Sequence, residues 1–169
     1  MKSEAVRALV AGLKEAGIQF VVSLPSSSFI PLIDAIANDP HFTHVPVSHE
    51  ANGIGICAGA WLGGKKPALV MQNLGLVLST YALMGALRLG GFPTLLVIDH
   101  RGDMGDKQGH WFFDFGRATP QILEVLEVPY RIVGGNFIAE IVRAQQTTEA
   151  CGKPVAVLLS GEEIYGKSI

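Results

Sequence analysis

Short apolar runs alternate with segments of helical periodicity along the whole chain, and this alternation constrains the fold more than any other feature. The apolar runs predict six strands, at residues 18–22, 43–47, 67–72, 93–98, 130–133 and 155–159. Between them, apolar residues at helical spacing predict helices at residues 4–16, 29–37, 50–62, 76–89, 120–126 and 137–150. Strands that alternate with helices form parallel sheets. We therefore expect an α/β fold, with a six-stranded parallel sheet and helices on both faces.

The length and composition fit one domain with part of its surface covered. The chain has 169 residues and contains no repeat, low-complexity tract or interdomain linker, so we expect a single domain over residues 1–169. Only 17% of the residues are charged, whereas 49% are apolar. This charge density is low for a surface that lies wholly in water. Either the core is large for the length, or a partner covers part of the surface, and we favour the partner.

Charge and hydropathy exclude several classes of function. The net charge is -2 and the charged residues are scattered, so no basic stripe could follow a nucleic-acid backbone. Residues 1–16 lack the apolar core of a signal peptide, and no apolar stretch is long enough to span a bilayer. Cys57 and Cys151 lie far apart in no metal-binding spacing. We expect a cytoplasmic protein with free thiols that binds neither nucleic acid nor a membrane.

Polar residues gather where the predicted strands end. Ligands of parallel sheets bind beyond the carboxyl ends of the strands. Four segments have that position, at residues 23–28, 48–53, 72–75 and 99–117. The last of them is long and contains four glycines and a Trp-Phe-Phe cluster, and long loops in small domains are usually functional.

Glu50 lies between a predicted strand and a helix of mostly small residues, 53–60. A carboxylate there is often only a first-turn acid that the helix dipole stabilises. The helix carries no charge, however, and suits close packing on both sides. Glu50 would then be poorly hydrated, and burial favours the protonated form of a carboxyl group, which can donate a proton.

Two further strand ends carry candidate residues, each with a structural alternative. Gln72, Asn73 and Gly75 could present amides to a cofactor ring or a substrate carboxylate, or could simply form a turn. For His100 we favour a role in proton transfer, whereas Arg101 could bind an anionic substrate or pair with a nearby aspartate. The serine run at residues 26–28 and the aromatic run at residues 110–113 could line a cleft or only support the local fold.

Three segments together resemble one known family. They are Ser-His-Glu-Ala-Asn-Gly-Ile-Gly-Ile-Cys-Ala-Gly-Ala at 48–60, a segment at 64–75 that ends in Met-Gln-Asn-Leu-Gly, and His-Arg-Gly-Asp at 100–103. Over essentially its whole length the chain resembles the α subunit of sulfopyruvate decarboxylase and the related phosphonopyruvate decarboxylase. Both belong to the thiamine diphosphate superfamily, and the resemblance implies its pyrimidine-binding domain.

The resemblance also implies roles for individual residues. Glu50 corresponds to the glutamate that hydrogen-bonds the aminopyrimidine ring of thiamine diphosphate. Gln72, Asn73 and Gly75 would lie at the cofactor. After carbon dioxide has left a small 2-oxo acid, His100 would supply the proton that releases an aldehyde. On the substrate side, Ser26 and Ser27 match a turn of related enzymes, and we also expect His49, Arg101 and His110 to contact the substrate.

Two departures from the family pattern shape the remaining expectations. The Gly-Asp-Gly signature that binds diphosphate and magnesium in this superfamily is absent. We therefore expect no metal ligand in this chain, and a hetero-oligomer in which a diphosphate-binding β subunit holds Mg²⁺ and completes the active site. Residues 110–117 are rich in aromatic side chains where the family has a Pro-containing stretch. The substrate could therefore be a 2-oxo acid larger or less charged than sulfopyruvate.

Three other functions remain open at this point. A carboligase subunit would use the same cofactor but pass the intermediate to an acceptor. A regulatory subunit would have lost catalysis, and a free-standing nucleotide-binding domain would need no partner.

Overall fold

The computed structural model describes residues 1–103, 106, 109–160 and 162–165, and they form a single six-stranded sheet. Every neighbouring pair of strands is parallel. In spatial order, the strands are β2 (Thr43–Pro46), β1 (Phe20–Ser23), β3 (Pro67–Gln72), β4 (Leu95–Asp99), β6 (Val155–Leu159) and β5 (Tyr130–Val133). The α/β fold with a six-stranded parallel sheet is thereby confirmed.

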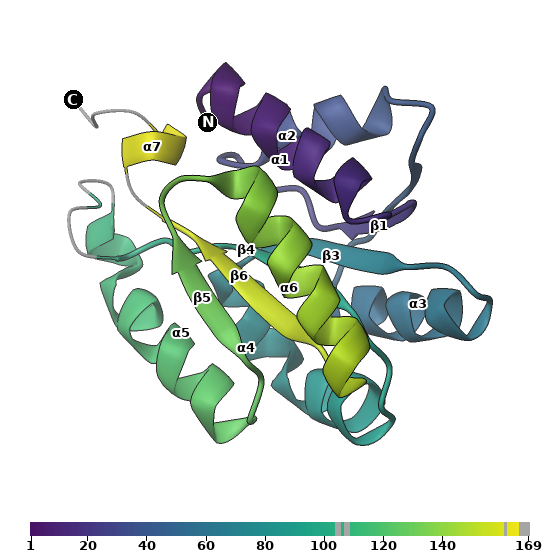
Figure 1. Ribbon diagram of the computed structural model, residues 1–169. Helices are drawn as coiled ribbons and strands as arrows, with labels where there is room; N and C mark the ends of the chain where they lie inside the picture. The colour runs from purple at the N-terminus through teal and green to yellow at the C-terminus, as the bar shows by residue number, and fades with distance from the viewer. Residues whose placement is uncertain (104–105, 107–108, 161, 166–169) are drawn as a thin grey trace.

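Helices cover both faces of the sheet (Figure 1). One face carries α1 (Ser3–Glu15), α2 (Ile30–Ala37) and α6 (Phe137–Cys151). The other face carries α3 (Glu50–Leu62), α4 (Asn73–Ala82) with its π-helical continuation η1 (Leu83–Leu89), and α5 (Phe113–Val125). Two short elements, η2 (Gly109–Trp111) and α7 (Glu162–Tyr165), complete the described chain.

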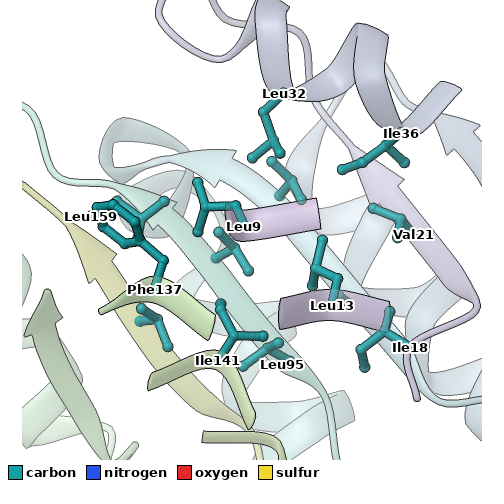
Figure 2. Packing of buried hydrophobic residues seen from close by; sticks show 14 of the residues in the cluster. Leu9, Leu13, Ile18, Val21, Leu32, Ile36, Leu95, Phe137, Ile141 and Leu159 are labelled. Carbon is teal, nitrogen blue, oxygen red and sulfur yellow. The ribbon is translucent and has the colours of Figure 1, made fainter. Parts of the chain in front are cut away.

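The core consists of two apolar layers, one on each face of the sheet. Side chains alternate along β4, so that Leu95 and Val97 join the layer under α1, α2 and α6 while Leu96 and Ile98 join the other. Figure 2 shows the first layer, where side chains of α1, α2 and α6 meet those of the central strands. Burial on both faces explains why the central strands read as continuous apolar runs rather than alternating ones.

The parallel arrangement brings the carboxyl ends of the strands to one edge of the sheet. In the strand register, Gln72 of β3 is paired with Asp99 of β4, and Asp99 is paired with Leu159 of β6. The C-terminal helix α7 lies near this edge. Ile164 is fully buried, and its carbonyl oxygen accepts a hydrogen bond of 2.7 Å from the backbone N–H of Lys2.

Two helices begin earlier than the sequence predicts. α4 begins at Asn73, not at residue 76, so that the predicted turn at Asn73 and Gly75 is already helical. α5 begins at Phe113, whereas the sequence suggests a start at Pro120 because proline favours the first helical turn. Pro120 instead lies inside α5, and the predicted loop is correspondingly shorter.

Candidate functional site

Glu50 lies at the start of α3 and is buried, with 5% of its surface exposed. Its side chain fills the space that a Cβ atom on Gly75 would occupy, since such an atom would lie 2.5 Å from Cδ of Glu50. No hydrogen bond or ion pair reaches the Glu50 carboxyl group from the described residues. The structure thus brings together two residues that the sequence places at a cofactor, and it shows that Gly75 makes room for Glu50.

The helix behind Glu50 packs closely on the sheet but is open on its other side. A Cβ atom on Gly53 would lie 2.9 Å from a methyl group of Leu69, so α3 needs glycine there. Gly55 and Gly59 are exposed, and a Cβ atom on either would have no neighbour within 4 Å. At the start of α3, Nδ1 of the exposed His49 accepts a hydrogen bond of 3.2 Å from the backbone N–H of Ala51. The expected close packing is therefore present on the sheet side alone.

Asn73 is fully buried at the start of α4. Its Nδ2 donates to the carbonyl oxygen of Arg101 at 2.7 Å and to Oγ1 of Thr119 at 3.2 Å. Its Oδ1 is buried and has no hydrogen-bond partner among the described residues. A buried amide with a free acceptor can receive a hydrogen bond from a ligand. The neighbouring Gln72 is half-buried at the tip of β3.

His100 follows β4 and is 3% exposed. Its Nε2 lies 2.9 Å from the carbonyl oxygen of Gly116 in α5. Because a carbonyl oxygen only accepts hydrogen bonds, Nε2 must carry a proton, and in the neutral ring Nδ1 then bears the lone pair. Nδ1 is buried and also has no partner in the described part of the chain.

Arg101 is held by contacts within the chain. Its Nε and one terminal nitrogen lie 2.9 and 3.3 Å from the two carboxylate oxygens of Asp106. Its guanidinium group also lies 5.3 Å from the ring centre of Phe112 and 5.9 Å from that of Tyr165. The pairing with an aspartate matches the structural alternative for Arg101, while its contact with substrate remains a prediction.

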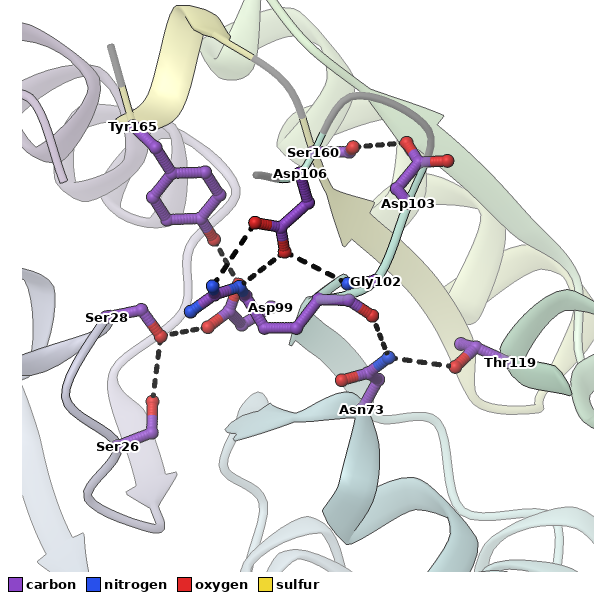
Figure 3. A network of polar contacts seen from close by, with 11 residues as sticks. Ser26, Ser28, Asn73, Asp99, Gly102, Asp103, Asp106, Thr119, Ser160 and Tyr165 are labelled. Carbon is purple, nitrogen blue, oxygen red and sulfur yellow. Dashed lines mark hydrogen bonds and ion pairs between the residues drawn. The ribbon is translucent and has the colours of Figure 1, made fainter. Parts of the chain in front are cut away.

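Asp99 is the centre of a buried network that the sequence does not reveal (Figure 3). The hydroxyl groups of Ser28 and Tyr165 both donate hydrogen bonds to its carboxylate. Burial raises the pKa of Asp99, although these two hydrogen bonds lower it in part. Burial also raises the pKa of Tyr165, so its hydroxyl group stays a donor. An aspartate that ends a fully apolar strand is the one sequence signal that could have drawn attention to it.

The predicted substrate-side residues lie apart from one another. Ser26 is half-buried, with its Oγ 3.4 Å from Oγ of Ser28, and therefore borders the Asp99 network. Ser27 is exposed in the same turn. His110 is exposed beside Trp111, with 5.0 Å between the ring centres. Among these residues, the described part of the chain connects the serine turn and Arg101 to the buried edge, and the substrate roles remain predictions.

The described residues contain no group of three or more His, Cys, Asp or Glu side chains that could hold a metal ion. Among the same residues, no helix is long and apolar enough to cross a membrane. Both cysteines, Cys57 and Cys151, are free.

Comparison with known proteins identifies the family. The family described as "Thiamine pyrophosphate enzyme, N-terminal TPP binding domain" matches residues 3–110, a region that contains Glu50, Gly75 and His100. The chain belongs to this thiamine pyrophosphate enzyme family. Thiamine pyrophosphate is the same compound as thiamine diphosphate, so the family expected from the sequence motifs is confirmed.

Several known decarboxylases or their subunits are similar to most of this chain. The sulfopyruvate decarboxylase subunit alpha of Methanothermobacter thermautotrophicus is 38% identical over 135 residues, covering 78% of this chain and 79% of that protein. The corresponding subunit of Methanococcus maripaludis is 36% identical over 75% of each chain. The phosphonopyruvate decarboxylase of Streptomyces viridochromogenes is 31% identical over 74% of this chain, which spans only 32% of that longer protein.

A solved structure of another enzyme supports the fold. The 2-oxoglutarate:ferredoxin oxidoreductase of Magnetococcus marinus superposes with a TM-score of 0.69 and 20% identity, over 94% of this chain and 29% of that one. At this identity the likeness shows the fold alone.

Proposed function

We propose that this chain is the α subunit of a thiamine diphosphate-dependent 2-oxo acid decarboxylase whose active site is completed by a second chain. One observation carries the proposal, namely the buried carboxyl group of Glu50 in the space left by Gly75. The names of two similar α subunits, both of sulfopyruvate decarboxylase, support the reaction class. We also propose that residues 1–169 form a single pyrimidine-binding domain.

The residues of the site fit the aminopyrimidine part of the cofactor. Such a ring presents both donors and acceptors. The Glu50 carboxyl group can receive or, when protonated, give a hydrogen bond, and Oδ1 of Asn73, unpaired among the described residues, can receive one. When bound, thiamine diphosphate supplies a carbon nucleophile and an electron sink for decarboxylation. We assign Mg²⁺ and the diphosphate to the second chain, because this sequence does not contain the Gly-Asp-Gly signature that binds them in the family.

In this proposal the chain's own residues hold and move protons. Glu50 is shielded from water, and its carboxyl group hydrogen-bonds the pyrimidine ring and exchanges a proton with it. His100 bears its free lone pair at Nδ1 and, once protonated there, gives that proton to the product. Ser26, Ser27, His49, Arg101 and His110 are retained as the proposed substrate side.

Exposed apolar residues on neighbouring helices support our proposal that a second chain binds this one. On α3, α4 and η1 large apolar side chains are exposed, with Leu62 at 72%, Leu78 at 67%, Tyr81 at 92% and Leu89 at 70%. Next to them, α4 and α5 border a shallow apolar hollow of about 310 Å³, lined by Thr80, Ala118, Gln121, Ile122, Val125 and Leu126. Several large exposed apolar side chains on neighbouring helices, together with an apolar hollow, are typical of a protein interface. Both thiols are free, which fits our assignment of the complex to the cytoplasm.

The proposal is tested by measuring carbon dioxide release from a panel of 2-oxo acids. The chain is co-purified with its candidate β subunit and supplied with thiamine diphosphate and Mg²⁺. We expect Glu50→Gln to lower kcat by about 10²-fold or more, because it removes the shared proton. The control, Glu15→Gln, alters an exposed acid on α1 and should keep wild-type activity. No release from any acid by a complex that binds the cofactor would contradict decarboxylation, and acceptor-dependent release would favour a carboligase.

A further inference from the structure

Pro120 lies in the interior of α5, where a proline is unfavourable. It has no N–H to donate, so the carbonyl oxygen four residues earlier, that of Gly116, lacks its usual helical partner. The proline ring also crowds that carbonyl and turns it away from the helix axis. α5 therefore presents an acceptor on its side that an uninterrupted helix would not offer.

His100 uses that acceptor. Its Nε2 donates to the Gly116 carbonyl oxygen at 2.9 Å, across sixteen residues of sequence from the tip of β4. The approach depends on glycine as well, because a Cβ atom on Gly116 would lie 2.8 Å from Cα of Gly102. Gly102 itself has a φ of +83°, and a Cβ atom on it would lie 2.9 Å from the backbone nitrogen of Phe113. Two backbone segments thus touch directly beside the imidazole ring.

We propose that Pro120 is a positioning residue for His100: it reserves the Gly116 carbonyl for Nε2 and so keeps the free lone pair of the ring at Nδ1. The inference rests on the proposed function, in which His100 supplies a proton to the product. A neutral imidazole in water exchanges between two tautomers, and a fixed acceptor at one nitrogen selects one of them. The selected tautomer leaves the buried Nδ1, which has no partner among the described residues, available to the reaction.

If Pro120 only supported the fold, replacing it would lower stability together with activity, whereas the positioning role predicts a loss of activity without a loss of stability. Alanine has a far higher helix propensity than proline in a helix interior. Pro120→Ala should therefore make the chain more stable, while its new N–H draws the Gly116 carbonyl back toward the helix axis and away from His100. Loss of activity together with a higher Tm separates positioning from support of the fold.

The experiment compares wild type, Pro120→Ala and Pro31→Ala in the complete complex. Pro31 is exposed in the first turn of α2 and releases no helical carbonyl, so its variant controls for loss of a helix proline. The first readout is the ¹⁵N chemical shifts of the His100 imidazole, which report the tautomer without requiring activity. We expect a proton on Nε2 in the wild type, a mixture of tautomers in Pro120→Ala, and a kcat lowered about tenfold with KM unchanged.

Each outcome decides the inference. A wild-type ring protonated at Nδ1 would overturn it, even if Pro120→Ala fails to fold. So would a Pro120→Ala complex with the wild-type tautomer and kcat. If the tautomer changes as expected but the wild-type complex releases no carbon dioxide, positioning of His100 stands and the proposed function is wrong.

Discussion

Gly75→Ala should inactivate the site while leaving the chain folded. A Cβ atom at this position would lie 2.5 Å from Cδ of Glu50. Ordinary carbon–carbon contact requires about 3.5 Å, so the Glu50 carboxyl group must move by about 1 Å. A misplacement of this size costs about 10²-fold in rate, which corresponds to roughly 2.7 kcal/mol of transition-state stabilisation.

The same substitution should change stability much less. Forcing an extra methyl group into a packed site costs about 1–3 kcal/mol. In the helix α4, replacing glycine by alanine returns about 1 kcal/mol. The net loss of about 0–2 kcal/mol is small beside the roughly 5–15 kcal/mol by which domains are stable. The variant should therefore unfold cooperatively in urea, close to the wild-type midpoint.

Carbon dioxide release by the complex at saturating 2-oxo acid measures the effect on kcat. Gly135→Ala is the matched control, because a Cβ atom there meets no neighbour within 4 Å. Since the loss acts through Glu50, Gly75→Ala should add little to the effect of Glu50→Gln in the double variant. A Gly75→Ala complex with kcat within about twofold of wild type would refute the reasoning. So would full additivity with Glu50→Gln.

Three further predictions concern burial, pH and the partner face. Burial raises the pKa of the Cys57 thiol to about 12, so we expect a thiol reagent to modify the exposed Cys151 alone in the native chain; labelling of Cys57 before unfolding, seen by mass spectrometry, would contradict this. Because burial raises the pKa of Asp99 above its ordinary value of 3.8, the stability that protonated Asp99 contributes is lost as the pH rises from about 4 through the raised pKa. The side chain introduced by Asp99→Asn does not titrate, so this variant should be more stable relative to wild type near about pH 8 than near about pH 4. A stability difference that does not change with pH would argue against burial of a charge. Finally, Tyr81→Glu, at a side chain 92% exposed on α4, should leave the chain folded but abolish its co-elution with the β subunit, whereas Ile132→Glu on the edge strand β5 should not.

The sequence predicts the sheet well because the signal for each strand is local. All six strands are found within two residues of their expected ends, since buried parallel strands require continuous apolar runs. The start of α5 was misplaced for an equally local reason. Pro120 carries a strong statistical signal for the first turn of a helix, and only the contact between Gly116 and the turn after β4 explains why the helix begins earlier.

The candidate site was predictable only in part. Glu50 and Gly75 stood out from the sequence, but their direct contact depends on how α3 and α4 pack side by side. The Asp99 network was missed because its two hydroxyl donors, Ser28 and Tyr165, are 71 and 66 residues away in sequence. Serine in a turn and tyrosine near a chain end have many uses, and no spacing relates them to Asp99.

The direct backbone contact between Gly102 and Gly116 ties the turn after β4 to the first part of α5. The chain leaves the sheet edge at Gly102, α5 begins at Phe113, and Gly102 and Gly116 are held against each other. A change in the length or composition of the sequence at residues 103–111 need not alter this contact, on which His100 depends in our proposal. Under the proposed function, related enzymes can therefore diverge in the acid that they accept by exchanging this segment, with His100 left in place.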